Sequence, residues 1–194
     1  MTGAGPVRRC PWADNSPLEM AYHDREWGRP LREDQALFEL MILEYMQSGL
    51  SWHLVLSRRE GMRQAFDGFD PVLIAGYSDE RLAQLMEDPR VIRNRLKIQA
   101  LRQNAQAFLR VAGEFGSFSD YLWGFVAGQP VRNAWTDVGQ VPSKTALSEA
   151  ISRDMKRRGF GFMGPTVTYA YLQAAGLVND HLVSCFCYDT KRTL

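Results

Sequence analysis

Cysteine, net charge and long apolar runs are all scarce in this 194-residue sequence. Three cysteines are too few for the disulfide framework of a small secreted protein, and in a cytosolic protein they leave metal binding open. The formal net charge of +1 neither requires nor excludes a nucleic-acid partner, because the positions of the charges decide that question.

No part of the sequence approaches the roughly 20 apolar residues that a membrane-spanning helix needs. The longest candidate, Leu37 to Met46, is interrupted by Glu39 and Glu44. The first residues, MTGAGPVRR, continue into polar sequence without the apolar segment of a secretory signal. We therefore expect a cytoplasmic protein without a membrane partner. Its content of 45% hydrophobic and 23% charged residues is that of a soluble globular protein.

Helical segments separated by short breaks make up most of the sequence. Residues suited to cap or precede a helix stand before several of these segments, at Asp34, Ser51, Asp70, Ser78 and Ser119. Proline suits a first helical position and glycine suits a helix end, which predicts starts at Pro71 and Pro165 and ends at Gly159 and Gly176.

Regular strands are not evident in the sequence. Residues 128–142 combine prolines and glycines without a clear period and are expected to form a loop. The predicted fold class is therefore all-α. Because both ends of the chain carry cysteine and histidine, we also expect a small terminal lobe that is tied to the helical body.

Four residues near the two ends form a candidate metal site: Cys10, His23, His181 and Cys185. The last two are four residues apart, so a helix or turn would place them on one face. Two thiolates and two imidazoles complete a tetrahedral zinc site, which is structural because no position remains for a reacting water. Alternatively, the cysteines are buried apolar groups and the histidines are satisfied locally. The long spacing does not decide between these interpretations, and Cys187 is a substitute ligand.

Glu44 stands inside an apolar helical segment, where burial of a carboxylate is costly unless a partner is present. It either points to water or recognises a cation or a hydrogen-bond donor of a ligand. Aromatic residues gather in the same part of the chain, at Trp12, Tyr22, Trp27, Tyr45 and Trp52. Core packing explains such rings, but rings beside an acid also form a cage for a flat cation, with about 0.5 to 2 kcal/mol from each ring.

A basic stretch contains Arg90, Arg93, Arg95, Lys97 and Arg102. Such a run is usually a solvated helix face. The apolar pair Val91-Ile92 beside it fits a short turn between two helices, which offers amides and cations to phosphates. His53 follows Trp52, and the sequence indicates no partner for it.

Together these residues resemble the bacterial 3-methyladenine DNA glycosylase I family, often called Tag. The resemblance extends from about Cys10 to Tyr188. It rests on the segments CPW at 10–12, AYHDREWG at 21–28, LFELMILE at 37–44, QSGLSW at 47–52, KRRGFGFMGPT at 156–166 and QAAGLVNDH at 173–181.

The resemblance implies a helix-hairpin-helix DNA glycosylase fold with an added zinc lobe. The expected single domain, 1–194, has a helical body at about 30–175 and a lobe formed by about 8–28 and 176–190. One structural Zn²⁺ would join the two ends of the chain through Cys10, His23, His181 and Cys185.

The resemblance also assigns roles to residues of the candidate site. Glu44 matches the base-recognition carboxylate and is the one catalytic candidate, Tyr22 matches a pocket tyrosine, and Trp52 matches a stacking indole. Further pocket aromatics fall on Trp12 and Trp27. The expected DNA contacts are a wedge, Gly49-Leu50, and a hairpin at about Val91 to Lys97 that includes Arg93, Arg95 and Lys97.

The activity that the resemblance implies is base-excision repair. Such an enzyme flips 3-methyladenine out of double-stranded alkylated DNA, releases the free base by hydrolysis and leaves an abasic site. We expect a monofunctional, monomeric N-glycosylase. A methylated adenine carries a positive charge and departs neutral, so little acid catalysis is needed.

Two positions depart from the family pattern. Tyr45, followed by Met46, stands where many members have glycine, and Glu19 stands where many have tyrosine. Both changes lie near the expected pocket and affect the base preference. They leave open a protein that binds damaged DNA without cutting it, or with altered specificity. A zinc hydrolase of small molecules is disfavoured, because the four-ligand site is closed.

Overall fold

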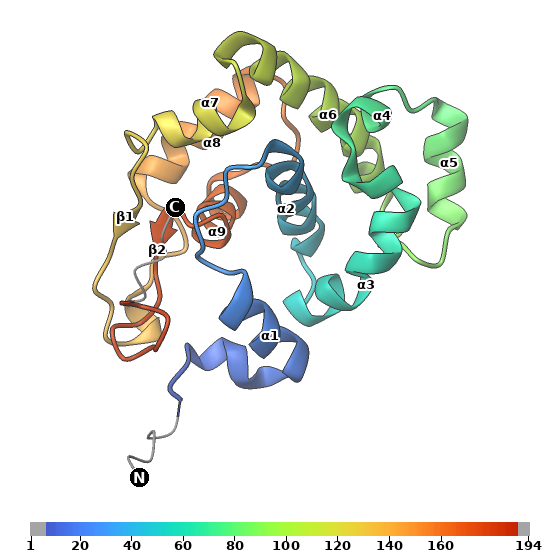
Figure 1. Cartoon of the computed structure of the whole chain (residues 1–194). Coiled ribbons are helices and arrows are strands. Elements are labelled where there is room, and N and C mark those ends of the chain that lie inside the picture. The colour runs from blue at the N-terminus through green and yellow to red at the C-terminus, as the bar shows by residue number, and fades with distance from the viewer. Residues whose placement is uncertain (1–6, 190–194) are drawn as a thin grey trace.

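The computed structural model describes residues 7–189, which fold into nine α-helices and one short pair of strands (Figure 1). The helices are α1 (Pro17–Arg25), α2 (Asp34–Gln47), α3 (Trp52–Ala65), α4 (Pro71–Ala75), α5 (Asp79–Glu87), α6 (Arg95–Phe115), α7 (Phe118–Gly124), α8 (Ala146–Arg157) and α9 (Pro165–Ala174). The ends of the expected domain, residues 1–6 and 190–194, lie outside the described residues. The predominance of helix confirms the predicted fold class.

Helix α2 lies at the centre of the helical body (Figure 1) and contacts α3, α6, α7 and α9. Every residue from Leu37 to Met46 is buried except Glu39, which is half-buried. A helix that is apolar on all sides requires neighbours on all sides, and burial of each large apolar side chain contributes about 1.5–3 kcal/mol. The packing therefore places Glu44, near the C-terminal end of α2, inside the protein.

Several helices begin where their capping residues predict. The Ser51 hydroxyl accepts the Leu54 amide at 3.2 Å at the start of α3, and the Ser78 hydroxyl accepts the Arg81 amide at 3.2 Å at the start of α5. Asp70 caps α4, with Pro71 at the first helical position. These caps involve neighbours in the sequence, which is why local patterns identify them.

One predicted cap is wrong, and one helix begins earlier than predicted. Glu33 caps α2, while the Asp34 carboxylate accepts the amides of Phe118 and Ser119 at 2.9 and 2.8 Å. Helix α7 has Ser117 as its cap and begins at Phe118, before the predicted Ser119. The contact between α2 and α7, which no local pattern contains, determines what Asp34 binds.

Glycine ends α8 and α9 as predicted. Gly159 has φ +95° and Gly176 has φ +74°, which is the left-handed region that favours glycine. A Cβ on Gly176 would lie only 2.4 Å from the carbonyl carbon of Arg29. The end of α9 therefore lies directly against the segment between α1 and α2, and Leu31 donates its amide to the Ala175 carbonyl at 3.0 Å.

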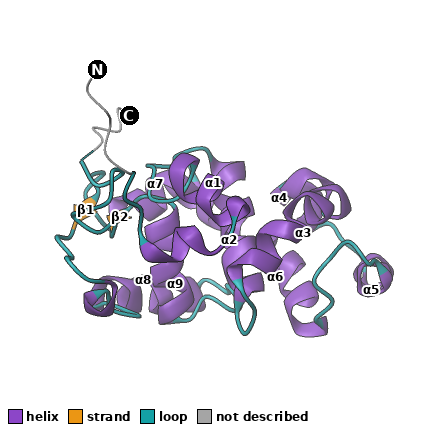
Figure 2. Ribbon diagram, turned by 90° about the horizontal axis from the view of Figure 1, so that it is seen from below, coloured by secondary structure: helices purple, strands orange, loops and turns teal. Residues whose placement is uncertain are grey.

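The region 128–142, predicted as a loop, contains one short strand. Strand β1 (Val131–Arg132) pairs in parallel with β2 (Val178–Asn179), and both lie at one end of the molecule (Figure 2). Two residues are too few for an alternating pattern, so the sequence carries no signal for this pair. The pairing joins the loop to the chain that follows α9.

Both ends of the described chain meet beside these strands. Cys10, Leu182, Cys185 and Cys187 form a hydrophobic cluster separate from the main core. The amide of Phe186 donates to the Arg8 carbonyl at 3.0 Å. In the part of the chain that the structure describes, no helix is both long and apolar enough to cross a membrane.

Candidate functional site

Glu44 is a buried acid without a protein partner. Glu44 is only 6% exposed, and its carboxyl makes no hydrogen bond or ion pair with the described residues. Burial raises the pKa of this carboxyl to about 8. A group left in this state is costly to the fold, and strongly perturbed acids in proteins gather at functional sites.

Tyr22 and Trp52 bring α1 and α3 to the same place. The two ring centroids are 5.2 Å apart, with the planes inclined by 58°. The Tyr22 hydroxyl is buried and has no hydrogen-bond partner among the described residues. Burial and the nearby Glu44 raise the pKa of Tyr22. Tyr22 on α1 is thus close to the indole on α3 and is acted on electrostatically by the acid on α2, while the role of these three residues in base binding stays a prediction.

Trp12 and Trp27 extend this aromatic group toward the cysteine and histidine cluster. The Trp12 ring lies 6.4 Å from Tyr22 and 5.2 Å from Trp27. Trp27 in turn stacks at 6.1 Å on His23 and meets His181 edge-on at 4.6 Å. Trp12 therefore connects the Tyr22–Trp52 pair to the cysteine and histidine cluster, and Trp27 packs on that cluster.

The unusual Tyr45 packs toward α6. Its hydroxyl donates to the Lys97 carbonyl at 3.4 Å, and its ring stacks on Phe162 at 5.9 Å. The ring is fully buried in these contacts. The sequence could not show on which side of α2 this ring lies, because that depends on which helices surround α2.

Lys97, one of the expected DNA contacts, has hydrogen-bond partners inside the protein. Its ammonium is buried and donates to the carbonyls of Met46 and Ser48 at 2.8 and 2.7 Å. These carbonyls lie at the C-terminal end of α2, where a cation is favoured. The structure therefore uses this charge inside the protein, and a contact of Lys97 with DNA stays a prediction. Arg93 and Arg95 are exposed, with no hydrogen bond or ion pair to the described residues.

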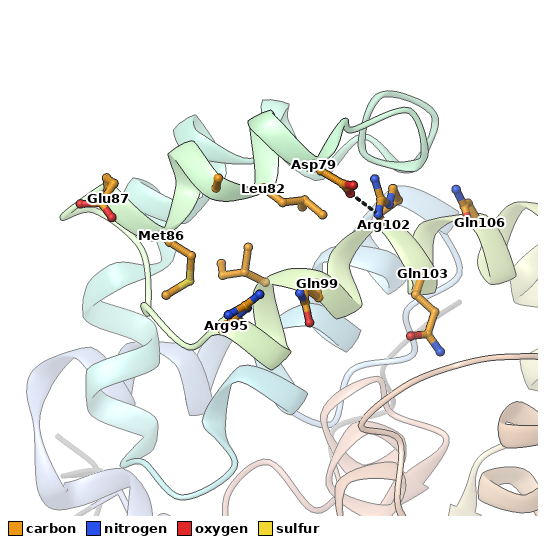
Figure 3. A pocket seen from close by; sticks show the side chains of 11 residues that line it. Asp79, Leu82, Met86, Glu87, Arg95, Gln99, Arg102, Gln103 and Gln106 are labelled. Atoms are coloured by element: carbon orange, nitrogen blue, oxygen red, sulfur yellow. Dashed lines mark hydrogen bonds and ion pairs between the residues drawn. The ribbon is translucent and has the colours of Figure 1, made fainter.

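Arg95 lines a groove between α5 and α6 that has a volume of about 850 Å³ (Figure 3). Leu82 and Met86 line one side, and an ion pair between Asp79 and Arg102 at 2.7 Å crosses one end. The groove contains neither Glu44 nor the aromatic group. Its size therefore does not identify it as the site of the chemistry.

Gly49 and Leu50 form the tip of the turn between α2 and α3. Gly49 is exposed with φ +79°, and a Cβ there would meet no atom within 4 Å. Leu50 is half-buried, and the Gln47 amide side chain donates to its carbonyl at 3.1 Å. The turn is therefore open on its outer side and directly precedes Trp52.

The four predicted metal ligands meet in space. Cys10 Sγ lies 3.6 Å from His181 Nδ1, and Cys185 Sγ lies 3.5 Å from both His181 Nδ1 and His23 Nε2. All four residues are buried, and their ligand atoms lie within 4.8 Å of one another. Tetrahedral zinc with ordinary bond lengths separates sulfur from nitrogen by about 3.5 Å. The donor set and its spacing therefore fit zinc.

Two aspartates beside these ligands were not singled out from the sequence. Asp24 accepts a hydrogen bond from His23 Nδ1 at 2.8 Å, which is how carboxylates orient metal-binding histidines. Asp180 is buried and accepts hydrogen bonds from four side chains, those of Asn133, Trp135, Tyr169 and Gln173. Their position next to His23 and His181 was the only available signal.

Cys187 lies near the same cluster. It forms a second group with His23 and Asp24 whose ligand atoms lie within 4.8 Å of one another. Its own amide lies 3.4 Å from Cys185 Sγ. The tetrahedral set uses Cys185, so Cys187 remains the substitute ligand.

Comparison with known proteins gives a consistent result. The sequence profile described as methyladenine glycosylase matches residues 12–188. The chain is 44% identical to DNA-3-methyladenine glycosylase 1 of Escherichia coli, over 96% of this chain and 100% of that protein. It is also 44% identical to DNA-3-methyladenine glycosylase of Haemophilus influenzae, over 92% and 97%.

Solved structures agree with the sequences. A crystal structure of 3-methyladenine DNA glycosylase I (TAG) superposes with a TM-score of 0.90 at 44% identity, over 93% of this chain and 100% of that chain. The Staphylococcus aureus enzyme, whose structure concerns 3-methyladenine recognition, superposes with a TM-score of 0.90 at 33% identity, over 95% and 98%. This chain therefore belongs to the methyladenine glycosylase family.

Proposed function

We propose that this protein is a monofunctional DNA glycosylase that releases 3-methyladenine from alkylated DNA and leaves an abasic site. One observation carries the proposal: the Glu44 carboxyl is buried without a partner among the described residues, and burial and this carboxyl together raise the pKa of Tyr22. The Tyr22 hydroxyl is likewise without a partner among these residues, and its ring lies 5.2 Å from that of Trp52. The relatives that the chain resembles carry the name of this activity.

The charge of the ligand explains why the acid is buried. Without a ligand, burial holds the pKa of Glu44 at about 8, so the group is mostly protonated at neutral pH. A cationic base next to it favours the ionised form and gains an attraction that water screens only weakly. Neutral adenine lacks this attraction, so the site prefers the methylated base.

Trp52 supplies the stacking surface. Because the planes of Tyr22 and Trp52 are inclined by 58°, they are not two parallel walls, and only one of them stacks on a flat base in this conformation. The Tyr22 hydroxyl then donates a hydrogen bond to the base or accepts one from it. Stacking on an indole adds a cation–π attraction that grows as water is excluded.

Bond cleavage needs little from the protein beyond binding. The methylated base departs as a neutral molecule, and the sugar passes through an oxocarbenium-like state before water adds. Glu44 stabilises the charged base and the charge that develops on the sugar. No lysine is assigned as a nucleophile, so the product is an abasic site and the DNA strand remains intact.

The base must leave the duplex before it reaches Glu44, at a cost of a few kcal/mol. The open turn at Gly49-Leu50 is suited to fill the vacated space, because the apolar side chain of Leu50 lies only two residues before Trp52. Arg93 and Arg95 are available for phosphates of double-stranded DNA. The connection from α8 to α9 is a second candidate for the hairpin, because Gly164 leaves the start of α9 without a side-chain cap.

A single structural zinc ion belongs to the same proposal. Cys10, His23, His181 and Cys185 would hold it, and it would join a lobe at about 8–28 and 176–190 to the helical body at about 30–175. The closed ligand set leaves it without a part in base release. A monomeric state and a cytoplasmic location stay predictions.

Single-turnover base release tests the function. Duplex DNA treated with a methylating agent is mixed with excess protein, and free 3-methyladenine is measured by chromatography while abasic sites are counted separately. We expect release by the wild type and a loss of about 100-fold or more in Glu44→Gln, as is usual when a preorganised charge is removed. Binding of methylated DNA without release would instead identify a protein that recognises damage without cutting it.

A further inference from the structure

Ser16, Glu19 and His53 form a hydrogen-bonded chain between α1 and α3 that the proposed mechanism does not use. Ser16 caps α1, and its hydroxyl donates to Glu19 Oε2 at 2.9 Å. The Ser16 hydroxyl oxygen also lies 3.1 Å from His53 Nδ1. Glu19 is buried although it is an acid, whereas His53 is exposed.

The proton on each group follows from simple counting. A serine hydroxyl has one hydrogen and two lone pairs. Ser16 gives its hydrogen to Glu19 Oε2 and accepts the Glu19 amide at 3.2 Å. The remaining lone pair faces His53, so Nδ1 must carry the proton that it donates. The order of donors is therefore His53 to Ser16 to Glu19.

The hydrogen bonds among Ser16, Glu19 and His53 lie next in sequence to the two rings of the candidate base site. Glu19 is three residues before Tyr22 and on the same side of α1. His53 directly follows Trp52 at the start of α3. The hydrogen bonds therefore join the helix that carries Tyr22 to the helix that carries Trp52, at the position where the rings are 5.2 Å apart.

We propose that Ser16, Glu19 and His53 act as a clasp that holds Trp52 in place against Tyr22, with Glu19 as a positioning residue for base recognition. The role rests on the proposed function for its effect on base binding, but the clasp itself is a property of the folded protein. Each half alone is weak: the Ser16 cap is an ordinary helix cap, and an exposed histidine gains little from one hydrogen bond. Together they restrict how α1 and α3 move apart.

The first test measures the clasp without any ligand. Nitrogen NMR of the imidazole reports which ring atom of His53 carries the proton, and we expect Nδ1 in the wild type. Ser16→Ala should remove this preference and shift the indole resonance of Trp52. An unchanged Trp52 resonance in Ser16→Ala, or a His53 with its proton on Nε2, would overturn the proposal.

The second test measures base recognition with free 3-methyladenine as the probe, followed by quenching of tryptophan fluorescence and by single-turnover release. We expect Ser16→Ala, Glu19→Ala and His53→Ala each to weaken binding by about five- to tenfold, the effect of roughly one hydrogen bond. Ser16→Thr keeps the hydroxyl, Glu19→Gln keeps an acceptor and His53→Asn keeps a donor. Each of these variants should therefore bind 3-methyladenine within about twofold of the wild-type affinity.

A matched control separates the clasp from ordinary capping. Ser78 caps α5 in the same way, with its hydroxyl 3.2 Å from the Arg81 amide, but it is not part of the site. Ser78→Ala should lower thermal stability about as much as Ser16→Ala does and leave base binding unchanged. Equal effects of the two variants on binding would overturn the positioning role.

The combined variants give the last check. If the clasp acts as one unit, Ser16→Ala with His53→Ala should be no worse than either alone, because the first change already breaks the chain. Additive losses of binding in the double variant would show that these residues act separately. Binding by Glu19→Gln as weak as that by Glu19→Ala would show that Glu19 acts through its charge. A wild type that neither binds nor releases 3-methyladenine would refute the proposed function, while the NMR result would still decide whether the clasp exists.

Discussion

The Lys97 ammonium donates to the Ser48 carbonyl at 2.7 Å, so the first turn of α6 is tied directly to the turn that carries Gly49 and Leu50. The same ammonium also binds the Met46 carbonyl at 2.8 Å. Burial lowers the pKa of Lys97, yet two carbonyls at a helix end compensate a positive charge well. A residue that resembles a phosphate contact in the sequence is thus part of the internal framework.

Lys97→Met should therefore reduce stability without changing the dependence of DNA binding on salt. The carbonyls of Met46, which is buried, and of Ser48, which is half-buried, would lose their donor, which we expect to cost about 1–3 kcal/mol in the free energy of unfolding. Arg93→Met is the matched change on the exposed side. It should leave stability unchanged and lower the slope of log affinity against log salt by about one unit. Denaturant unfolding and DNA titrations at several salt concentrations measure both quantities, and a reversed pattern would return Lys97 to the DNA surface.

Glu44 should make stability depend on pH in an unusual direction. Its folded pKa of about 8 lies above the ordinary value of 4.5 for this side chain. Between these two pH values the folded state therefore holds a proton that the unfolded state has lost. Stability therefore falls as pH rises through this window, and the full penalty applies above about pH 8. The shift corresponds to about 3–5 kcal/mol.

Glu44→Gln removes the ionisable group from the same place. This variant should be more stable than the wild type at pH 9, and the difference should diminish toward pH 5. Thermal or denaturant unfolding at pH 5, 7 and 9 measures it. A constant difference across this range would mean that Glu44 has a protein partner in solution.

Gly176→Ala should be strongly destabilising, by about 3 kcal/mol or more. The new Cβ would lie 2.4 Å from backbone of Arg29, and φ is +74°. Gly113→Ala is the control, because this exposed glycine lies inside α6 with no atom within 4 Å of a Cβ. That change should stabilise the protein by about 0.5–1 kcal/mol. Unfolding midpoints compare the two, and a tolerated Gly176→Ala would exclude the close approach to Arg29.

Metal analysis of the purified protein should find about one zinc per chain. Removal by a chelator should lower the unfolding temperature, because the ion would join segments from the two ends of the chain. Cys185→Ser should lose the metal, whereas Cys187→Ser should retain it, since Cys187 lies outside the tetrahedral set. Retention in Cys185→Ser together with loss in Cys187→Ser would assign the site to Cys187 instead.

The sequence alone determined those features that depend on neighbouring residues. The caps at Ser51, Asp70 and Ser78 and the ends at Gly159 and Gly176 follow from hydrogen bonds and backbone angles within one turn. The motifs identified the family and the residues Tyr22, Glu44 and Trp52. The spacing of Cys10, His23, His181 and Cys185 left a metal site as only one of two interpretations, because no local pattern links residues at opposite ends of the chain.

Only the tertiary structure decided which groups meet. Asp34 binds the start of α7 instead of capping its own helix, Lys97 binds the end of α2 instead of facing solvent, and Tyr45 packs on Phe162. His53, which had no partner in the sequence, reaches Ser16. The physical reason is common to all four: each side chain satisfies its hydrogen bonds or buries its ring against an element distant in sequence, and helix packing determines which element that is.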